Sequence, residues 1–353
     1  MLSSSRLLPL LATLIALVAW PSAANAAEKA IWGPTHLPNG TPAFPTYKDL
    51  GVDTYQSFLY WHHIASARPL RPQDPNDPAY KWPAHFDDAV KQAASSGIKV
   101  APVVMGSPGW ANGGRHWRWA PKSNRDYADF LVAVSRRYPN IRRWQIWGEP
   151  SHPSNFQPGG LPASARRYAT LLDAAYVALK KRNSRNIVIG GMTFTTSATV
   201  TPVRFLRELR LPSGKRPRLS WWGHNPFSRR YPDGRTQTYS RYGRDINDMD
   251  VFAREVQSAY RNTGIRPKLW LSEFTIQSGH GSSTFNFSVP RNQQDDWIKA
   301  AFGLANKQSS IAGLGWLSLV DDKPRPDHLE KNWGLLGWKG AKKPAYYAYR
   351  RAP

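Results

Sequence analysis

The sequence predicts an α/β fold, a single (β/α)8 or TIM barrel. Three observations carry this prediction. Apolar strand-like runs alternate with helical patterns from about residue 30 to the end of the 353-residue chain. One barrel of about 250 to 330 residues uses nearly all of that length. Two of the runs end in a glutamate, Glu149 and Glu273, and the carboxyl ends of barrel strands form the mouth that carries the active site.

Strands are expected where short apolar runs stand between turn residues. In chain order the runs are 31–33, 54–60, 98–105, 141–147, 187–190, 219–223, a run that ends at Glu273, and 311–319. The sixth run has the weakest pattern and opens into a long loop over 225–245.

Helices are expected between these runs, because apolar side chains recur there every three or four residues. Tyr127, Phe130 and Val134 form one such stripe, and Gly97 marks the end of an earlier helix. The last helix is expected to pack beside the first strand and close the fold. The expected helices are 86–96, 125–138, 163–182, 247–262, 295–307 and 344–350.

Residues 1–26 have the pattern of a signal peptide. Arg6 precedes an apolar stretch over 7–20, and Ala24-Asn25-Ala26 supplies the small residues of a cleavage site. The stretch is short for a membrane span, which needs about 20 residues. We therefore expect a secreted protein, extracellular or associated with the cell envelope, with one barrel domain over 27–353.

Composition constrains the partners of the chain. The sequence has no cysteine, which excludes disulfides and thiolate metal sites. It has 48 Lys and Arg against 24 Asp and Glu, a formal charge of +24. Such a field favours anionic partners such as acidic polymers or anionic cell envelopes. We expect a monomer with no cofactor and no required metal, no membrane span in the mature form, and no nucleic-acid partner, since the leader takes the protein away from nucleic acid.

The two glutamates are the candidate catalytic residues. Strand alternation puts Trp270 on the side opposite Glu273, facing outward, and groups Glu149 with Gln145 and Trp147. In one parallel barrel both strands open onto the same mouth. Hydrolysis of a glycoside needs one carboxylic acid to protonate the leaving oxygen and one carboxylate at the anomeric carbon. A single glutamate at a strand end is more simply explained as a solvated charge or as half of an ion pair. Two strands that both end in a glutamate make this explanation much weaker.

The residues around both glutamates carry a resemblance to a known family. Trp144-x-x-Trp147-Gly148-Glu149-Pro150 and Trp270-Leu271-Ser272-Glu273-Phe274 resemble the strand-four and strand-seven signatures of clan A glycoside hydrolases. The segment 102–110 is similar to the strand-three ending of family 39-like enzymes, and family 5-like enzymes are the other resemblance. The resemblance implies a retaining glycosidase with Glu149 as the acid/base and Glu273 as the nucleophile. Glu149 then needs a raised pKa, and Glu273 needs donors that keep it ionised.

Two positions depart from the resemblance. Clan members usually carry Asn before the acid/base, in contact with the sugar 2-hydroxyl, whereas this chain has Gly148. Their strand-six His-x-Tyr is here His224-Asn225-Pro226-Phe227, so Asn225, His224 or Tyr231 would have to substitute for the tyrosine. For His224, a structural hydrogen-bonding role and a direct substrate contact both stay open.

Further residues are candidates for binding the carbohydrate substrate. Trp110 and Trp316 follow strand ends, where flat rings stack on the apolar faces of sugars. Arg229 and Arg230 lie in the basic loop over 225–245, which also contains tyrosines and would adjoin the mouth. This loop either binds an acidic polysaccharide or cell-envelope glycan, or is a solvated charged loop.

Other interpretations compete with the glycosidase. The pairs His62-His63 and Asp321-Asp322 suggest a metal, but adjacent side chains usually point apart, so we expect none. The altered motifs suggest a non-catalytic carbohydrate-binding barrel as one rival. The charge suggests a polyanion- or envelope-binding protein as another. The sequence leaves the sugar, the linkage and the anomer open.

Overall fold

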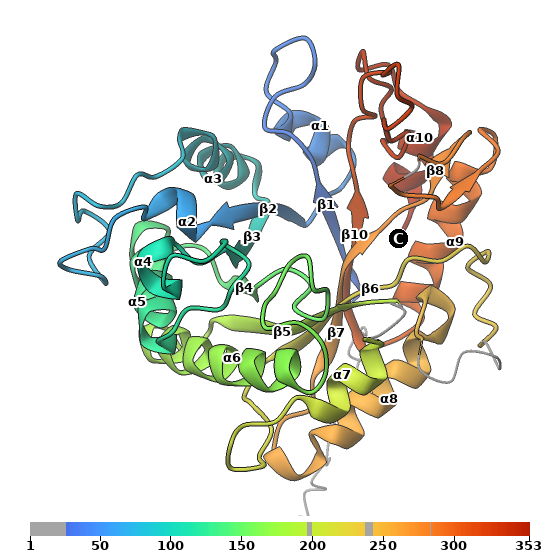
Figure 1. Cartoon of the computed structure of the whole chain (residues 1–353). Coiled ribbons are helices and arrows are strands. Elements are labelled where there is room, and N and C mark those ends of the chain that lie inside the picture. The colour runs from blue at the N-terminus through green and yellow to red at the C-terminus, as the bar shows by residue number, and fades with distance from the viewer. Residues whose placement is uncertain (1–25, 196–199, 237–242, 283) are drawn as a thin grey trace, which may run out of the picture.

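The chain folds into a closed barrel of eight parallel strands. The computed structural model describes residues 26–195, 200–236, 243–282 and 284–353. The strands follow one another round the barrel in the order β1-β10-β7-β6-β5-β4-β3-β2, and every pairing is parallel (Figure 1). They are β1 (Glu28–Trp32), β2 (Thr54–Tyr60), β3 (Lys99–Met105), β4 (Arg143–Ile146), β5 (Ile187–Phe194), β6 (Trp221–Asn225), β7 (Lys268–Phe274) and β10 (Ile311–Leu317). The predicted (β/α)8 barrel is confirmed.

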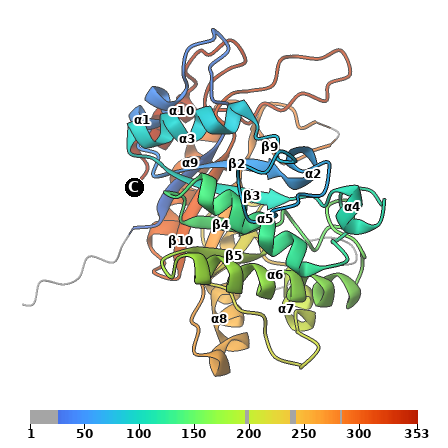
Figure 2. The same ribbon diagram turned by 90° about the vertical axis from the view of Figure 1, so that its left-hand side faces the viewer.

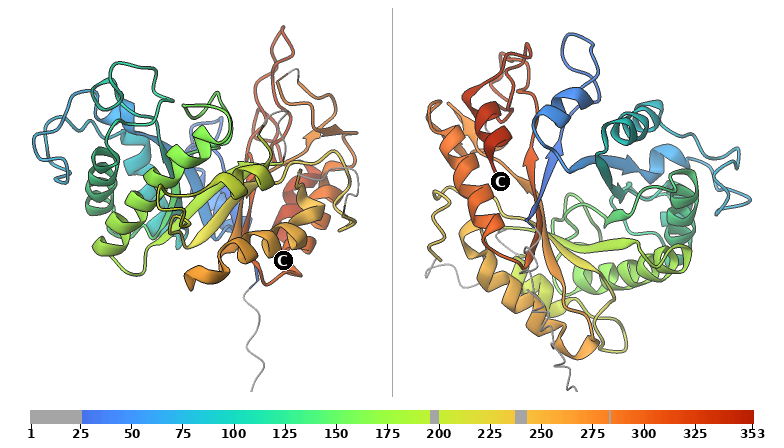
Figure 3. Two further views of the ribbon diagram at one scale, coloured as in Figure 1. Left: turned by 60° about the horizontal axis from the view of Figure 1, so that its bottom comes forward. Right: turned by 180° about the vertical axis from the view of Figure 1, so that it is seen from behind.

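Helices surround the strands, as both views of Figure 3 show. They are α1 (Phe44–Asp49), α2 (Trp61–Ile64), α3 (Ala84–Ser96), α4 (Gly109–Asn112), α5 (Asn124–Arg137), α6 (Ala163–Arg182), α7 (Pro202–Glu208), α8 (Met249–Ala259), α9 (Gln294–Asn306) and α10 (Pro344–Arg351). Short 3-10 turns precede and follow α8 (Ile246–Asp248 and Arg261–Thr263), and two short strands, β8 (Gln277–Ser278) and β9 (Ser288–Val289), pair outside the barrel. No described helix is long and apolar enough to cross a membrane.

Local sequence explains where the elements begin and end. β3 is buried in all but its first residue, as expected of a strand covered on both faces, and its sequence is almost wholly apolar. Gly97 adopts the left-handed conformation (φ 71°) that ends α3. Ser123 accepts a hydrogen bond from the Arg125 backbone NH and caps α5.

Several strands differ in extent from the prediction, and β1 and β6 are two of them. β1 starts at Glu28 rather than at residue 31. The prediction began too late because Glu28 and Lys29 are charged and interrupt the apolar pattern. The buried Lys29 ammonium donates to the carbonyls of Tyr349 (2.8 Å) and Ala352 (3.1 Å) and ties β1 to the end of α10. β6 lies two residues later than expected, so it ends at Asn225. This shift places Asn225 at the mouth.

A polar network fills the centre of the barrel. Gln56 Oε1 of β2 lies within hydrogen-bond distance of Gln145 Nε2 (3.0 Å), Trp270 Nε1 (3.1 Å) and Ser272 Oγ (3.0 Å). Its amide nitrogen donates to the Ser272 carbonyl (2.8 Å), which also accepts from Trp32 Nε1 (2.9 Å). All these polar groups are buried, and each has a partner. The network links β1, β2, β4 and β7 directly beneath the mouth.

The network also corrects the expected side-chain directions. Trp270 was expected to face the outer helices, yet it bonds to Gln56 across the barrel and stacks on Trp221 with ring centroids 5.8 Å apart. Alternation along β7 would then turn Glu273 outward. A bulge prevents this, because three residues of β7 advance against two of β10 between the pairs Leu271–Leu314 and Phe274–Trp316.

The two ends of the barrel are distinct. The start of β1 and the C-terminal Pro353 line one shallow depression at the amino ends of the strands. Figure 2 shows the C-terminus at this end and α2 and α4, which follow β2 and β3, at the opposite end. The opposite end is the mouth formed by the carboxyl ends of the strands.

Candidate active site

A small pocket of about 180 Å³ opens at the carboxyl ends of the strands. Residues from β2 to β7 and the loops after them contribute to its walls. They are Phe58, Tyr60, Val103, Met105, Trp117, Gly148, Glu149, Asn155, Met192, Asn225 and Glu273. Both predicted catalytic glutamates therefore lie in one cavity, at the place where barrels of this kind carry their active sites.

Strained backbone aims Glu149 into the pocket. Trp147 (φ 63°) and Glu149 (φ 44°) both adopt positive φ, which costs free energy for residues other than glycine. Trp147 consequently packs against Tyr127 of α5 and donates to the Asn155 carbonyl (2.8 Å). The expected grouping of Gln145, Trp147 and Glu149 on one face is wrong, because the chain turns after β4 ends.

Two amide side chains hold the Glu149 carboxyl. Asn225 Nδ2 donates to Oε1 (2.9 Å), and Asn155 Nδ2 donates to Oε2 (3.2 Å). Burial raises the pKa of Glu149, and the Asn225 hydrogen bond opposes that rise. The raised pKa agrees with the expectation for an acid/base.

Glu273 has a different environment. Burial, and after it the charge of Glu149, raise the pKa of Glu273. Burial, and after it the charge of Glu273, raise the pKa of Tyr60, the last residue of β2, which lines the same pocket. Both amides donate to Glu149, and no described side chain donates to Glu273, which is the opposite of the expectation that donors keep Glu273 ionised.

Gly148 has no room for a side chain of ordinary size without a shift of its neighbours. A Cβ on Gly148 would lie 3.2 Å from Met105 Sδ and 3.5 Å from Val103 Cγ1. Where the resemblance leads one to expect an amide, the wall of the pocket is therefore a thioether and a methyl group.

His224 lies beneath the pocket and not in its wall. Its side chain is buried, with Nε2 2.9 Å from the Arg244 carbonyl and Nδ1 2.9 Å from Thr193 Oγ1. A carbonyl only accepts, so Nε2 carries the proton and Nδ1 accepts from the threonine. Burial lowers the pKa of His224 to about 4, which keeps the ring neutral. Of the two roles left open, the structure favours the structural one.

Neither tryptophan predicted to stack on sugar lines the pocket. Trp110 donates to the Ala65 carbonyl (2.7 Å) and lies edge-on to Trp61, with the Arg68 guanidinium 4.5 Å from its ring. Trp316 is fully buried and donates to the Trp333 carbonyl (3.1 Å). Full burial excludes Trp316 from stacking on a sugar, whereas Trp110 is partly exposed outside this pocket and its role stays a prediction.

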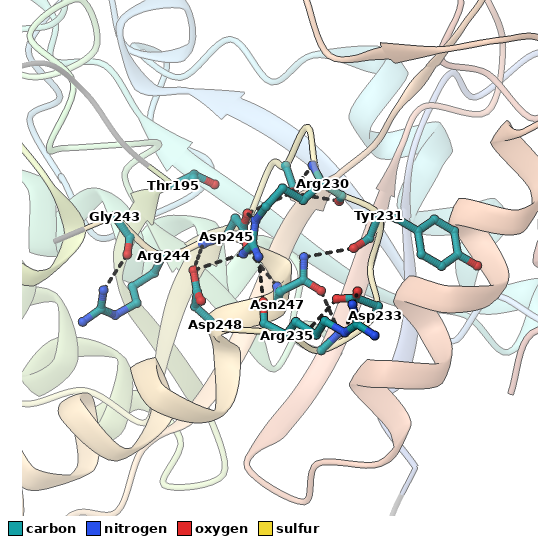
Figure 4. A network of polar contacts seen from close by, with 12 residues as sticks. Thr195, Arg230, Tyr231, Asp233, Arg235, Gly243, Arg244, Asp245, Asn247 and Asp248 are labelled. Carbon is teal, nitrogen blue, oxygen red and sulfur yellow. Dashed lines mark hydrogen bonds and ion pairs between the residues drawn. The ribbon is translucent and has the colours of Figure 1, made fainter. Parts of the chain in front are cut away.

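The basic loop after β6 is held together by its own ion pairs. Arg230 donates to Asp245 through Nη2 (2.7 Å) and Nε (3.1 Å), as Figure 4 shows, and Asp248 lies 3.8 Å away. Arg229 is exposed, with its guanidinium 5.7 Å from the Phe287 ring. Neither arginine lines the pocket, and residues 237–242 of this loop lie outside the described residues. The charge of Arg230 is thus already neutralised.

The histidine pair also differs from expectation. The rings of His62 and His63 lie 4.1 Å apart, and His62 stacks on Trp117. Burial, and after it the neighbouring histidines, lower the pKa of His62 to about 4. Within the described ranges no three metal-ligating side chains gather at one place.

Sequence reasoning missed several residues that line the pocket. The available signal was position, because Tyr60 and Met105 are the last residues of β2 and β3. Asn155 had no signal, since it reaches the pocket through the irregular loop after β4. Met192 lies in β5, which was expected to end at residue 190 and continues to Phe194.

Solved structures with the same architecture include glycoside hydrolases. A family 39 glycoside hydrolase from the gut symbiont Bacteroides cellulosilyticus has a TM-score of 0.68 at 19% identity, over 93% of this chain and 64% of the other. A glucosidase from Croceicoccus marinus has a TM-score of 0.63 at 15% identity, over 92% and 64%. A monomeric β-xylosidase from Caulobacter crescentus has a TM-score of 0.57 at 14% identity, over 92% and 67%.

Sequence comparison alone finds no relative. No family model matches the chain, and no curated protein matches it either. The chain spans about two thirds of the length of the structures it resembles. At these identities the likeness is one of fold, a (β/α)8 barrel that this chain shares with these glycoside hydrolases.

Proposed function

We propose that this protein is a secreted retaining glycosidase that hydrolyses an O-glycosidic bond of a polysaccharide or glycoconjugate. The observation that carries the proposal is the pair Glu149 and Glu273, which meet from β4 and β7 in one small pocket at the mouth of the barrel. Their pKa values are both raised, Glu273 in part by the charge of Glu149, so the two carboxyls favour holding one proton between them. Such a pair supplies both groups that glycoside hydrolysis requires.

In the first step the Glu273 carboxylate attacks the anomeric carbon. The bond from that carbon to the glycosidic oxygen breaks, and the oxygen takes the proton of Glu149. The products are a covalent glycosyl ester on Glu273 and a free alcohol. In the second step Glu149 removes a proton from water, the water oxygen attacks the anomeric carbon, and the Glu273 carboxylate leaves.

The polar contacts of the pocket suit these roles. When Glu149 gives up its proton it becomes a carboxylate, and the amides of Asn225 and Asn155 stabilise that charge. Glu273 gains its stabilisation from the substrate, since positive charge develops at the anomeric carbon beside it. Asn225 Oδ1 is buried and has no partner among the described residues, so it is available to accept from a sugar hydroxyl.

The substrate class follows from the site and from its neighbours. The structures that share the fold include a glucosidase and a β-xylosidase, which supports a carbohydrate substrate. We propose that the leader over 1–26 directs export and that the mature chain starts at Ala27. The basic surface favours acidic glycans through long-range attraction, whereas Arg230 is engaged with Asp245.

The test uses the purified mature chain and a panel of 4-nitrophenyl glycosides. We expect Glu149→Gln and Glu273→Gln each to lose most turnover, while Glu208→Gln on the surface retains it. A 2-fluoro glycoside inactivator should label Glu273, as peptide mapping would establish. Label on another residue would overturn the nucleophile, inverted product would overturn retention, and glycan binding without turnover would favour the non-catalytic barrel.

A further inference from the structure

One wall of the pocket is apolar. It is formed by Val103 and Met105 of β3 and by Met192 of β5, which are at most 4% exposed. Phe58 extends this wall and stacks on Tyr60 at a centroid distance of 5.5 Å. A sugar ring seated between the two glutamates meets methyl, thioether and phenyl groups on this side.

The apolar wall reaches the catalytic carboxyl. Gly148 precedes Glu149, and the space beside its Cα is filled by Met105, whose Sδ and Cε lie 3.2 and 3.7 Å from the position of a Cβ. A side chain at position 148 would require Met105 to shift by a few tenths of an ångström. The part of the sugar nearest to Glu149 on this side therefore packs against Met105 and Val103.

The amide nitrogens of the pocket are already engaged, which leaves Asn225 Oδ1 of β6 as an acceptor for a hydroxyl that does not face this wall. The NH2 groups of Asn155 and Asn225 both donate to Glu149. Tyr60 and Trp117 also line the pocket and carry polar atoms. A hydroxyl pressed against Met105 and Val103 would lose its bonds to water and gain none, which is costly for a buried polar group.

We propose that the sugar held between Glu149 and Glu273 is a deoxy sugar, whose carbon without a hydroxyl packs against Met105 and Val103. This inference rests on the proposed function, because it names the substrate class of the same site. The carbon is either a ring methylene, as in a 2-deoxy glycoside, or an exocyclic methyl, as in a 6-deoxy glycoside. Both present an apolar surface that suits a thioether and methyl wall.

Two matched substrate pairs distinguish these sources. A 4-nitrophenyl 2-deoxyglucoside is compared with the glucoside of the same anomer, and a D-fucoside with the D-galactoside of the same anomer, which differs only in the 6-hydroxyl. The measured quantity is the ratio of kcat/KM within a pair. Because the intrinsic reactivity of each substrate cancels when two enzymes are compared, the change of that ratio between variants reports the wall alone.

The variants are Met105→Gln and Met105→Leu. Glutamine has nearly the shape of methionine and carries an amide, whereas leucine keeps the wall apolar. In one pair we expect Met105→Gln to move the ratio at least about tenfold towards the hydroxylated sugar, which is about 1.4 kcal/mol. Met105→Leu should leave the ratio within about threefold. An unchanged ratio in both pairs for folded Met105→Gln, or a wild-type preference for the hydroxylated sugar in both, would overturn the proposal.

A binding measurement separates this proposal from the enzymatic one. Calorimetry with Glu273→Gln and the same four glycosides needs no turnover. Tighter binding of a deoxy member, reversed by adding Met105→Gln, would support the deoxy-sugar site even if the wild-type chain hydrolyses nothing. Turnover with tighter binding of both hydroxylated members would support the glycosidase and overturn the deoxy sugar, and binding of none of the four would also overturn it.

Discussion

Gln56 is the residue through which the barrel core positions the catalytic strand β7. It meets Gln145, Trp270 and Ser272 at distances of 2.8 to 3.1 Å, and Ser272 directly precedes Glu273. The change Gln56→Met keeps the length of the side chain and removes its acceptor and its donor. It therefore isolates the contribution of the hydrogen bonds from that of packing.

The magnitude follows from which partners keep another bond. The Gln145 amide retains the Ala101 carbonyl (3.0 Å), and the Ser272 carbonyl retains Trp32 Nε1 (2.9 Å). The Trp270 indole NH retains none among the described residues and becomes a buried donor without a partner. Such a group costs about 1–3 kcal/mol. We expect Gln56→Met to lower the free energy of unfolding by about 2 kcal/mol.

Urea unfolding followed by tryptophan fluorescence measures this loss. The midpoint should fall with an unchanged slope, because the surface exposed on unfolding is the same. Gln92→Met is the matched control, since Gln92 on α3 makes one side-chain bond, to Asp88 of the same helix (2.6 Å). If the free energies of unfolding of Gln56→Met and Gln92→Met differ by less than about 0.5 kcal/mol, the central network does not stabilise the barrel.

Two further predictions concern the charges at the mouth. In Glu149→Gln the negative charge that raises the pKa of Glu273 is lost, so Glu273 ionises at lower pH, and the half-maximal rate of labelling by a 2-fluoro glycoside should shift to lower pH. A midpoint that stays or rises would contradict this coupling. Arg230→Ala leaves the buried Asp245 without its guanidinium and should lower the free energy of unfolding by about 3 kcal/mol, far more than Arg229→Ala. It should weaken the binding of acidic and neutral glycans equally. A selective loss of affinity for acidic glycans, measured by titration, would instead indicate that Arg230 contacts the substrate.

Much of the fold could be predicted from the sequence because the patterns that indicate it lie within short segments. β3 is an apolar run covered on both faces, and Gly97 ends the preceding helix, so both follow from short stretches of sequence. The predicted strand boundaries were wrong where the burial of a residue depends on contacts with residues far away in the sequence. Lys29 is a buried strand residue only because the carbonyls at the end of α10 accept its hydrogen bonds.

The sequence predicted which strand ends form the candidate site, but not the directions in which the side chains point. Glu149, Glu273 and Asn225 stand where parallel strands finish, and parallel strands finish together. Strand alternation misplaced Trp270, because a bulge near the end of β7 breaks the period of two.

By itself, the sequence determined the barrel and the pair of glutamates at its mouth, since hydrophobic periodicity and strand order need no knowledge of contacts. The tertiary structure decided what surrounds them. It buried Trp316, paired Arg230 with Asp245 and put Met105 against Gly148. These outcomes depend on which side chains meet across the barrel and its loops, and such meetings between residues far apart in the chain leave no local pattern in the sequence.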